Sequence, residues 1–157
     1  MALYFHKPGE GNHRSQVIIL ACQVEGVLEA ILNGYFKKIY DNSQNKSSYA
    51  FEKLEKDLFS FNTGIMGGIF KANKTCLYLD LIEYEVSHDI DKLIKIRNAY
   101  AHKAGSGQLS DDDELFGYIE DTYFYKRNRG ALKELSKQDV LDQYSKHLTD
   151  KLKGYLS

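Results

Sequence analysis

The chain contains few of the residues that form disulfides or interrupt helices. Its 157 residues include one proline and two cysteines. The proline, Pro8, lies outside every segment with helical periodicity, so it interrupts none of them. Cys22 and Cys76 lie in separate apolar segments and are too few for a disulfide framework. We interpret both as reduced thiols in the core of a cytosolic protein.

The chain also lacks an excess of charge of one sign and long apolar runs. The 21 lysine and arginine residues nearly balance 22 aspartate and glutamate residues, so a contact with nucleic acid requires a local basic patch. No apolar run approaches the length of a bilayer-spanning helix, and residues 1–10 lack the order of a signal peptide. We expect a cytoplasmic protein without membrane contact.

Metal-ligand spacing is absent as well. The histidines outside residues 97–102 show no such spacing to one another or to the cysteines, and we assign them surface or capping roles: His6, His13, His88 and His147. We therefore expect no metal and no other cofactor.

The apolar periodicity predicts about five or six helices and no strand. The first helix is expected over about residues 13–40, followed by a polar loop over residues 41–48. Phe51, Leu54 and Leu58 mark a shorter helix, and a glycine-containing turn is expected at residues 59–68. One helix is then predicted over about residues 69–86.

The second half of the chain carries clear capping signals. Ser87 or Asp89 is expected to cap a helix that ends with residues 97–102, before Gly105 and Gly107. Two capping boxes, Ser110 with Asp113 and Ser136 with Asp139, predict a helix through Tyr123 and a final helix, with residues 126–130 as the basic segment between them. The prediction is an all-α bundle in a single domain, residues 1–157.

The hexapeptide of residues 97–102 combines a permanent cation, Arg97, with the amide of Asn98 and the imidazole of His102. An arginine grips phosphate with a rigid fork of donors, and a histidine exchanges a proton near neutral pH. Reaction at a ribose 2′-hydroxyl requires both actions. In the alternative interpretation Arg97 pairs with a carboxylate, Asn98 and His102 satisfy backbone groups at the helix end, and Tyr100 packs.

The geometry of a helix favours a shared site. Asn98 and His102 are four residues apart and lie on one face, whereas Arg97 and His102 are about 140° apart around the axis. A symmetric dimer, in which two copies of the segment face each other, would align the two groups better than one helix.

This Arg-Asn-x3-His pattern resembles the signature of the HEPN superfamily, helical proteins in which an Arg, a polar residue, three variable residues and a His form an RNase centre. The resemblance implies a HEPN-like fold and a metal-independent endoribonuclease or RNA-binding relative of toxin or defence type. Arg97, Asn98 and His102 would be its catalytic residues, at the cleft of a homodimer. An antitoxin or regulatory protein is an implied partner, although the extended motif with a Tyr two residues after the His is absent because Ala104 stands there.

A second resemblance covers Phe59 to His102. The order of a glycine-containing turn, the Leu-Tyr-Leu-Asp-Leu-Ile segment at residues 77–82 and then the hexapeptide is similar to the mannitol operon repressor family. Members of that family are described as transcriptional regulators. Asn73 and Lys74 stand where an Arg is common in the family. The resemblance implies an alternative function, a non-enzymatic regulator that acts through protein–protein contacts.

One dense basic cluster follows, made of Lys126, Arg127, Arg129 and Lys133 and flanked by Tyr123 and Tyr125. Such a combination is typical of a surface that holds an RNA backbone and stacks a base. The alternative is a solvated loop with its aromatic neighbours in the core. The twelve tyrosines exceed what a helical core needs, and we expect some of them at an oligomer interface.

Overall fold

The computed structural model describes residues 13–42, 52–53, 56–57, 67–102 and 113–156. The described residues form six longer helices and no strand, which confirms the all-α prediction. The helices are α1 (His13–Asp41), α3 (Ile69–Tyr78), α4 (Tyr84–His102), α5 (Asp113–Glu120), α6 (Tyr123–Leu132) and α7 (Lys137–Gly154). Most of the predicted loop at 41–48, the apolar residues of the predicted helix at 51–58, most of the turn at 59–68, and Gly105, Gly107 and Ser110 lie outside the described residues.

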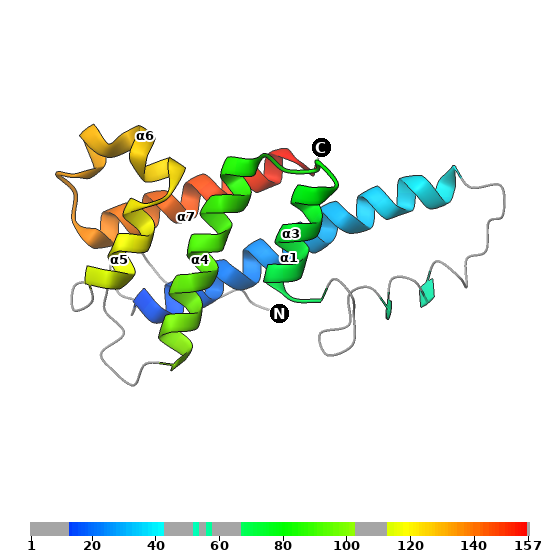
Figure 1. The fold of residues 1–157 in the computed structure, drawn as a ribbon, viewed down its shortest axis with the longest axis horizontal. Helices are drawn as coiled ribbons and strands as arrows, with labels where there is room; N and C mark the ends of the chain where they lie inside the picture. The colour runs from blue at the N-terminus through cyan, green and yellow to red at the C-terminus, as the bar shows by residue number, and fades with distance from the viewer. Residues whose placement is uncertain (1–12, 43–51, 54–55, 58–66, 103–112, 157) are drawn as a thin grey trace.

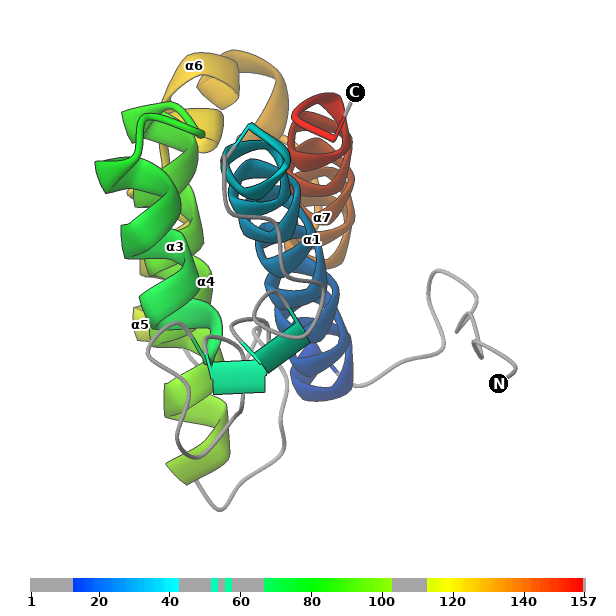
Figure 2. The same cartoon turned by 90° about the vertical axis from the view of Figure 1, so that its right-hand side faces the viewer.

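The helices form two layers. Figures 1 and 2 show α1 and α7 side by side in one layer and α3, α4 and α5 in the other, with α6 connecting the layers at one end. The predicted periodicity of the last helix is confirmed, because Val140, Leu141, Tyr144, Leu148 and Leu152 of α7 are all buried. The core lies between the layers.

The long N-terminal helix was predicted correctly, and its apolar face packs on α3, α4 and α7. By length and composition alone α1 could cross a membrane, so the expectation that no segment reaches that length is wrong for this helix. The core helix of a bundle passes the same test. Val17, Leu20, Val24 and Leu28 of α1 are indeed fully or almost fully buried in the protein.

The predicted helix over residues 69–86 is wrong, because the chain turns between Tyr78 and Tyr84. Asp80 adopts a φ of 56° there, a left-handed conformation that no helix interior contains. Leu79 and Leu81 still pack against the core from the turn, which maintains the apolar spacing across the break. As a consequence α4 begins at Tyr84, and Ser87 and Asp89 are buried inside it instead of capping it.

Two further boundaries differ from the predictions. The helix that the Ser110 and Asp113 box was expected to open, through Tyr123, ends at Glu120, and Tyr123 starts α6 instead. The side chain of Thr122 caps α6 by accepting a hydrogen bond from the backbone N–H of Tyr125. The basic segment at residues 126–130 is therefore helical and not a loop.

Single residues also differ from their assignments. Cys76 is a buried free thiol, as expected, and burial raises its pKa to about 12. Cys22 is a free thiol but is exposed on α1, so its assignment to the core is wrong. Of the histidines given surface or capping roles, His13 is buried at the start of α1, so a surface role is wrong for it, and His88 and His147 are half-buried.

Candidate functional site

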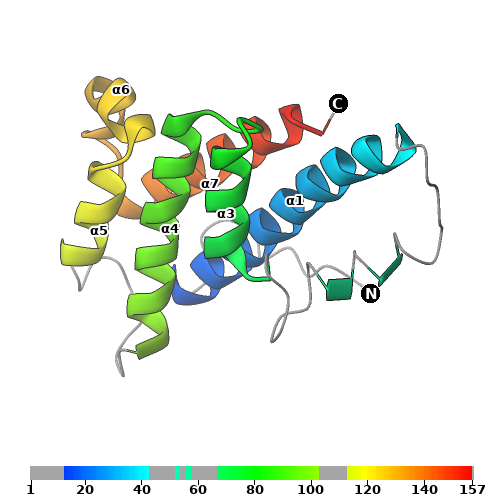
Figure 3. The same ribbon diagram turned by 45° about the vertical axis from the view of Figure 1, so that its right-hand side comes forward.

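Arg97, Asn98 and His102 lie in the last two turns of α4. The first part of this helix is held in the core by Ile90, Leu93, Ile94 and Ile96. Tyr100 is its last buried residue, and Ala101 and His102 are exposed. Figures 1 and 3 show that this end of α4 extends beyond the neighbouring helices α3 and α5. The hexapeptide is thus presented at a projecting tip of the bundle.

The tip brings Arg97 and Asn98 together. The Arg97 Nη1 atom donates a long hydrogen bond of 3.4 Å to Asn98 Oδ1. Arg97 leaves α4 on the side of the buried residues, and this bond shows its guanidinium directed round the helix toward the exposed side. His102 is four residues beyond Asn98 on that exposed side, since positions four apart stack on one face. Asn98 therefore lies between the cation and the imidazole.

The alternative interpretation, in which these residues have structural roles, is confirmed only in part. Tyr100 packs, with an exposed fraction of 4%. Within the ranges that the structure describes, Arg97 makes no ion pair with a carboxylate. In those ranges no bond from Asn98 or His102 to a backbone group is found either. Among the described residues, the tip therefore presents a guanidinium without a carboxylate partner beside an exposed amide, with an exposed imidazole on the same helix end.

The basic cluster lies at the opposite end of α4. Lys126, Arg127 and Arg129 are exposed on α6, and Lys133 is its exposed C-cap. The Arg127 Nη2 atom donates to Glu85 Oε1 at 2.5 Å, in the first turn of α4. At about 1.5 Å per residue, Glu85 is about 25 Å from the end of the helix at His102. The structure therefore does not bring the predicted RNA-binding residues and the predicted catalytic residues to one point.

Ion pairs hold most of this cluster. Asp121 accepts hydrogen bonds from the ammonium groups of both Lys126, at 2.6 Å, and Lys92. These two lysines hold the pKa of the Asp121 carboxyl well below its usual range, and the bond to Asp121 raises the pKa of Lys126. Lys133 lies 4.0 Å from Glu134. Arg129 has no carboxylate partner among the residues with described positions.

Only one of the two flanking tyrosines is accessible. Tyr125 is buried and packs edge-on against Phe116, with ring centroids 6.2 Å apart, so its predicted role in base stacking is wrong. Tyr123 is half-buried and contacts the rings of Tyr84 and His88 of α4. Neither of these two partners was predicted. A signal was present, because Tyr84 and His88 are four apart and therefore share a helix face.

The sequence predicted Asp89 only as a cap of its own helix, and its contact with α6 was not predicted. Its side chain is buried, and its two oxygens accept hydrogen bonds from the backbone N–H groups of Tyr123, at 2.7 Å, and Phe124, at 3.0 Å. It thus closes the N-terminus of α6 from a neighbouring helix. Asn73 and Lys74 likewise join α3 to α4, since both donate to the carboxylate of Asp91.

A hollow of about 550 Å³ lies at α6 and α7. It is lined by Phe124 of α6 and by five residues of α7: Gln143, Lys146, His147, Asp150 and Lys151. Burial lowers the pKa of His147, whose ring stacks on Phe124 with centroids 4.8 Å apart. Across the described ranges, no three His, Cys, Asp or Glu side chains converge as metal ligands.

Comparison of the chain with protein families, with curated proteins and with solved structures finds no match. The two family resemblances therefore stay predictions.

Proposed function

We propose that the protein is a metal-independent endoribonuclease of HEPN type whose active site is built from Arg97, Asn98 and His102. The observation that supports the proposal is the projecting end of α4. There a guanidinium without a carboxylate partner in the described part of the chain contacts the amide of Asn98, and His102 is exposed on the same helix end. A phosphate could replace the long Arg97–Asn98 contact without breaking an ion pair. A structural arginine would instead be expected to pair with an acid.

The reaction needs only these groups and the RNA itself. The ribose 2′-oxygen attacks the adjacent phosphorus, so that the O2′–P bond forms and the P–O5′ bond breaks. The His102 imidazole takes the 2′-hydroxyl proton, the leaving 5′-oxygen takes a proton from water, and the imidazolium then returns its proton to the hydroxide that remains. Arg97 neutralises the charge that develops on the phosphoryl oxygens, and Asn98 orients the arginine. The products are a 2′,3′-cyclic phosphate and a 5′-hydroxyl end.

A homodimer completes the site. Arg97 and His102 leave one helix about 140° apart, so a single copy presents them in different directions. Two projecting α4 ends that pack against each other would place the arginine of one copy opposite the histidine of the other.

The test is RNA cleavage in excess EDTA, with single-stranded and structured RNA and with end groups identified on a denaturing gel. We expect His102→Ala to lower the rate by about 10²- to 10⁴-fold, as for loss of a general acid or base. Arg97→Ala should cause a similar loss, and Arg97→Lys should recover part of the rate because it keeps the charge without the fork. Lys153→Ala, which removes an exposed cation from α7, serves as the control and should leave the rate unchanged.

The contrary result would be a wild-type protein that cuts no RNA together with a His102→Ala variant whose melting temperature falls by several degrees. His102 would then be a structural residue at a helix end, and the regulator that acts through protein contacts would be the better description.

A further inference from the structure

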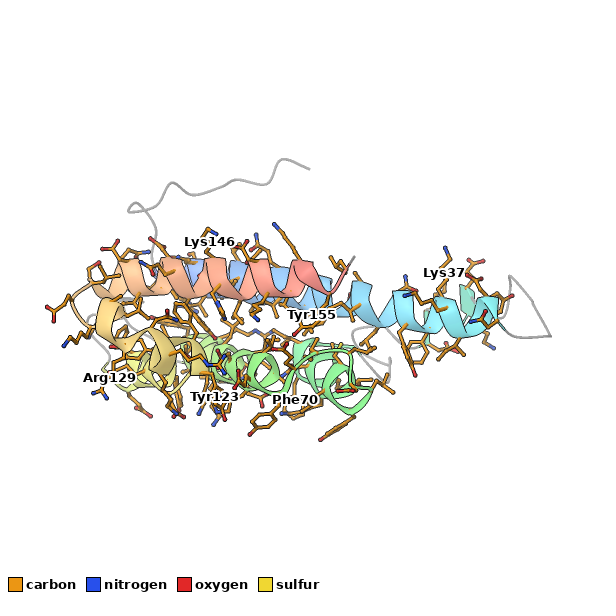
Figure 4. The ribbon with its side chains drawn as sticks, turned by 90° about the horizontal axis from the view of Figure 1, so that it is seen from above. Lys37, Phe70, Tyr123, Arg129, Lys146 and Tyr155 are labelled. Atoms are coloured by element: carbon orange, nitrogen blue, oxygen red, sulfur yellow. The ribbon has the colours of Figure 1, made fainter. Side chains whose placement is uncertain are left out.

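Three aromatic rings cluster on the outer face of the layer that contains α4. Tyr84 and His88 come from the first turns of α4, and Tyr123 is the first residue of α6. The His88 and Tyr123 centroids lie 5.0 Å apart, and Tyr84 lies 6.3 Å from each of the other two rings. Figure 4 shows Tyr123 on the side of the protein away from α1 and α7. Tyr84 is 61% exposed, so the cluster faces solvent.

A buried carboxylate beneath the cluster holds it in place. The backbone N–H of Tyr123 is bonded to the buried Asp89 carboxylate, which fixes the start of α6 against α4. His88 and Tyr123 are only half-buried. Each of the three rings lies against the other two, so their positions do not depend on a ligand. Such a preformed aromatic surface binds a flat ring with little loss of side-chain freedom.

Cations surround the rings. Lys126 and the almost buried Lys92 share the carboxylate of Asp121. Arg127 is bonded to Glu85 beside Tyr84. Lys126 and Arg127 are exposed, and exposed ion pairs are worth about 0–1 kcal/mol, so a phosphate can replace Asp121 or Glu85 as their partner at small cost. Stacking surfaces next to exchangeable cations are the composition that single-stranded nucleic acids bind.

The aromatic cluster and the tip of α4 lie on the same side of the helix. Tyr84 and His102 are the first and last residues of the 19-residue helix. That separation is about five full turns of about 3.6 residues each, so both side chains leave the helix on the same side, about 27 Å apart. Lys95 is exposed on that side between them, with its ammonium 5.8 Å from the Tyr118 ring.

We propose that the Tyr84, His88 and Tyr123 cluster stacks bases of a single-stranded nucleic acid whose backbone contacts Lys126 and then follows α4 toward His102. That the strand is RNA rests on the proposed function; the stacking and the path do not. A protein partner would use the aromatic rings equally well. The exposed side chains of Lys126, Arg127 and Lys95 lie beside the rings and along the same side of α4, and they favour a polyanion.

The test measures binding without cleavage. A fluorescent 2′-O-methyl oligouridylate has no free 2′-hydroxyl and cannot react, so its anisotropy reports the dissociation constant alone. We expect Tyr84→Ala to raise that constant by about five- to a hundredfold, the range for loss of one base–aromatic stack. Tyr84→Phe keeps the ring and should bind nearly as well as the wild type. Tyr78→Ala is the matched control, because Tyr78 is a 79% exposed tyrosine on α3 with no ring contact to the cluster. Lys126→Ala should reduce the slope of log affinity against log salt by about 0.7, as for one phosphate contact of a single strand.

Two results would overturn the inference: no binding of the oligonucleotide at protein concentrations up to about 100 μM, where even non-specific binding is normally seen, or equal effects of Tyr84→Ala and Tyr78→Ala. Binding that needs Tyr84 in a protein that cuts no RNA would support this inference and contradict the proposed nuclease. Cleavage that needs His102, with unchanged affinity in Tyr84→Ala, would do the reverse.

Discussion

At the scale of the residue, Asp89 shows how one buried residue joins three helices. It belongs to α4, its side-chain oxygens accept from the first two backbone N–H groups of α6, and its backbone carbonyl accepts the Tyr144 hydroxyl of α7 at 2.6 Å. The negative charge lies at the positive end of the α6 dipole, which offsets the cost of burying it. Tyr144 has no exposed surface, and burial raises the pKa of its hydroxyl well above its usual range. The hydroxyl therefore remains a donor at neutral pH.

Asp89→Ala should lower the free energy of unfolding by about 2–4 kcal/mol, because it leaves two backbone N–H groups at a buried helix end without an acceptor. Asp89→Asn keeps one oxygen and loses the charge, so we expect a loss smaller than that of the alanine variant. Urea denaturation followed by circular dichroism measures both. Asp150→Asn, which removes the carboxylate of an exposed pair with Lys146, is the control and should change stability by less than about 1 kcal/mol. Equal losses in Asp89→Ala and Asp150→Asn would mean that Asp89 does not hold α6.

At the scale of the element, the sequence predicted helices where local signals agreed with the packing. The final helix begins where the Ser136 and Asp139 box placed it, and the Ser136 Oγ atom accepts from the Asp139 N–H at 3.1 Å. The turn between α3 and α4 was not predictable, because it contains neither glycine nor proline and because its leucines continue the helical spacing. The left-handed backbone at Asp80 ends the helix there. A chain reversal made by tertiary packing leaves no such local signal.

Ser136→Ala should cost about 1 kcal/mol of stability, since the first turn of α7 loses its side-chain acceptor. Ser145→Ala in the middle of the same helix is the matched control. The Ser145 Oγ atom donates to the Leu141 carbonyl at 2.8 Å, a contact that does not stabilise a helix, and alanine has the higher helix propensity. We expect that variant to be as stable as the wild type or slightly more so. Thermal unfolding of the two variants side by side measures the difference, and a Ser136→Ala variant as stable as Ser145→Ala would contradict the capping role.

At the scale of the whole molecule, the sequence located the hexapeptide at a helix end but not its relation to the basic cluster. The periodicity alone placed Asn98 and His102 on one face and Arg97 on another, and the structure agrees with this. The sequence could not show that the basic cluster lies at the far end of α4, because the separation along the chain between residues 102 and 126 does not fix a distance in space. Nor could it show that Tyr125 is buried while Tyr123 meets Tyr84.

The projecting end of α4 leads to a prediction about assembly. One helix directs Arg97 and His102 to different sides, so the proposed reaction requires two copies. Light scattering should give twice the mass of the monomer, and a strict monomer at micromolar concentration would exclude the shared site.

A mixing experiment tests the composite site directly. Arg97→Ala and His102→Ala are each expected to be inactive as homodimers, since every cleft then lacks one group. Unfolded together and refolded in equal amounts, they form heterodimers in about half of the molecules, and one of the two clefts in each heterodimer combines an intact arginine with an intact histidine. The mixture should therefore recover about a quarter of the wild-type rate, whereas the double variant Arg97→Ala with His102→Ala, mixed with inactive His102→Ala, should recover none. If each cleft instead took both groups from one copy, no mixture of the single variants would regain activity, and Arg97 would have to reach His102 along its own helix by way of Asn98.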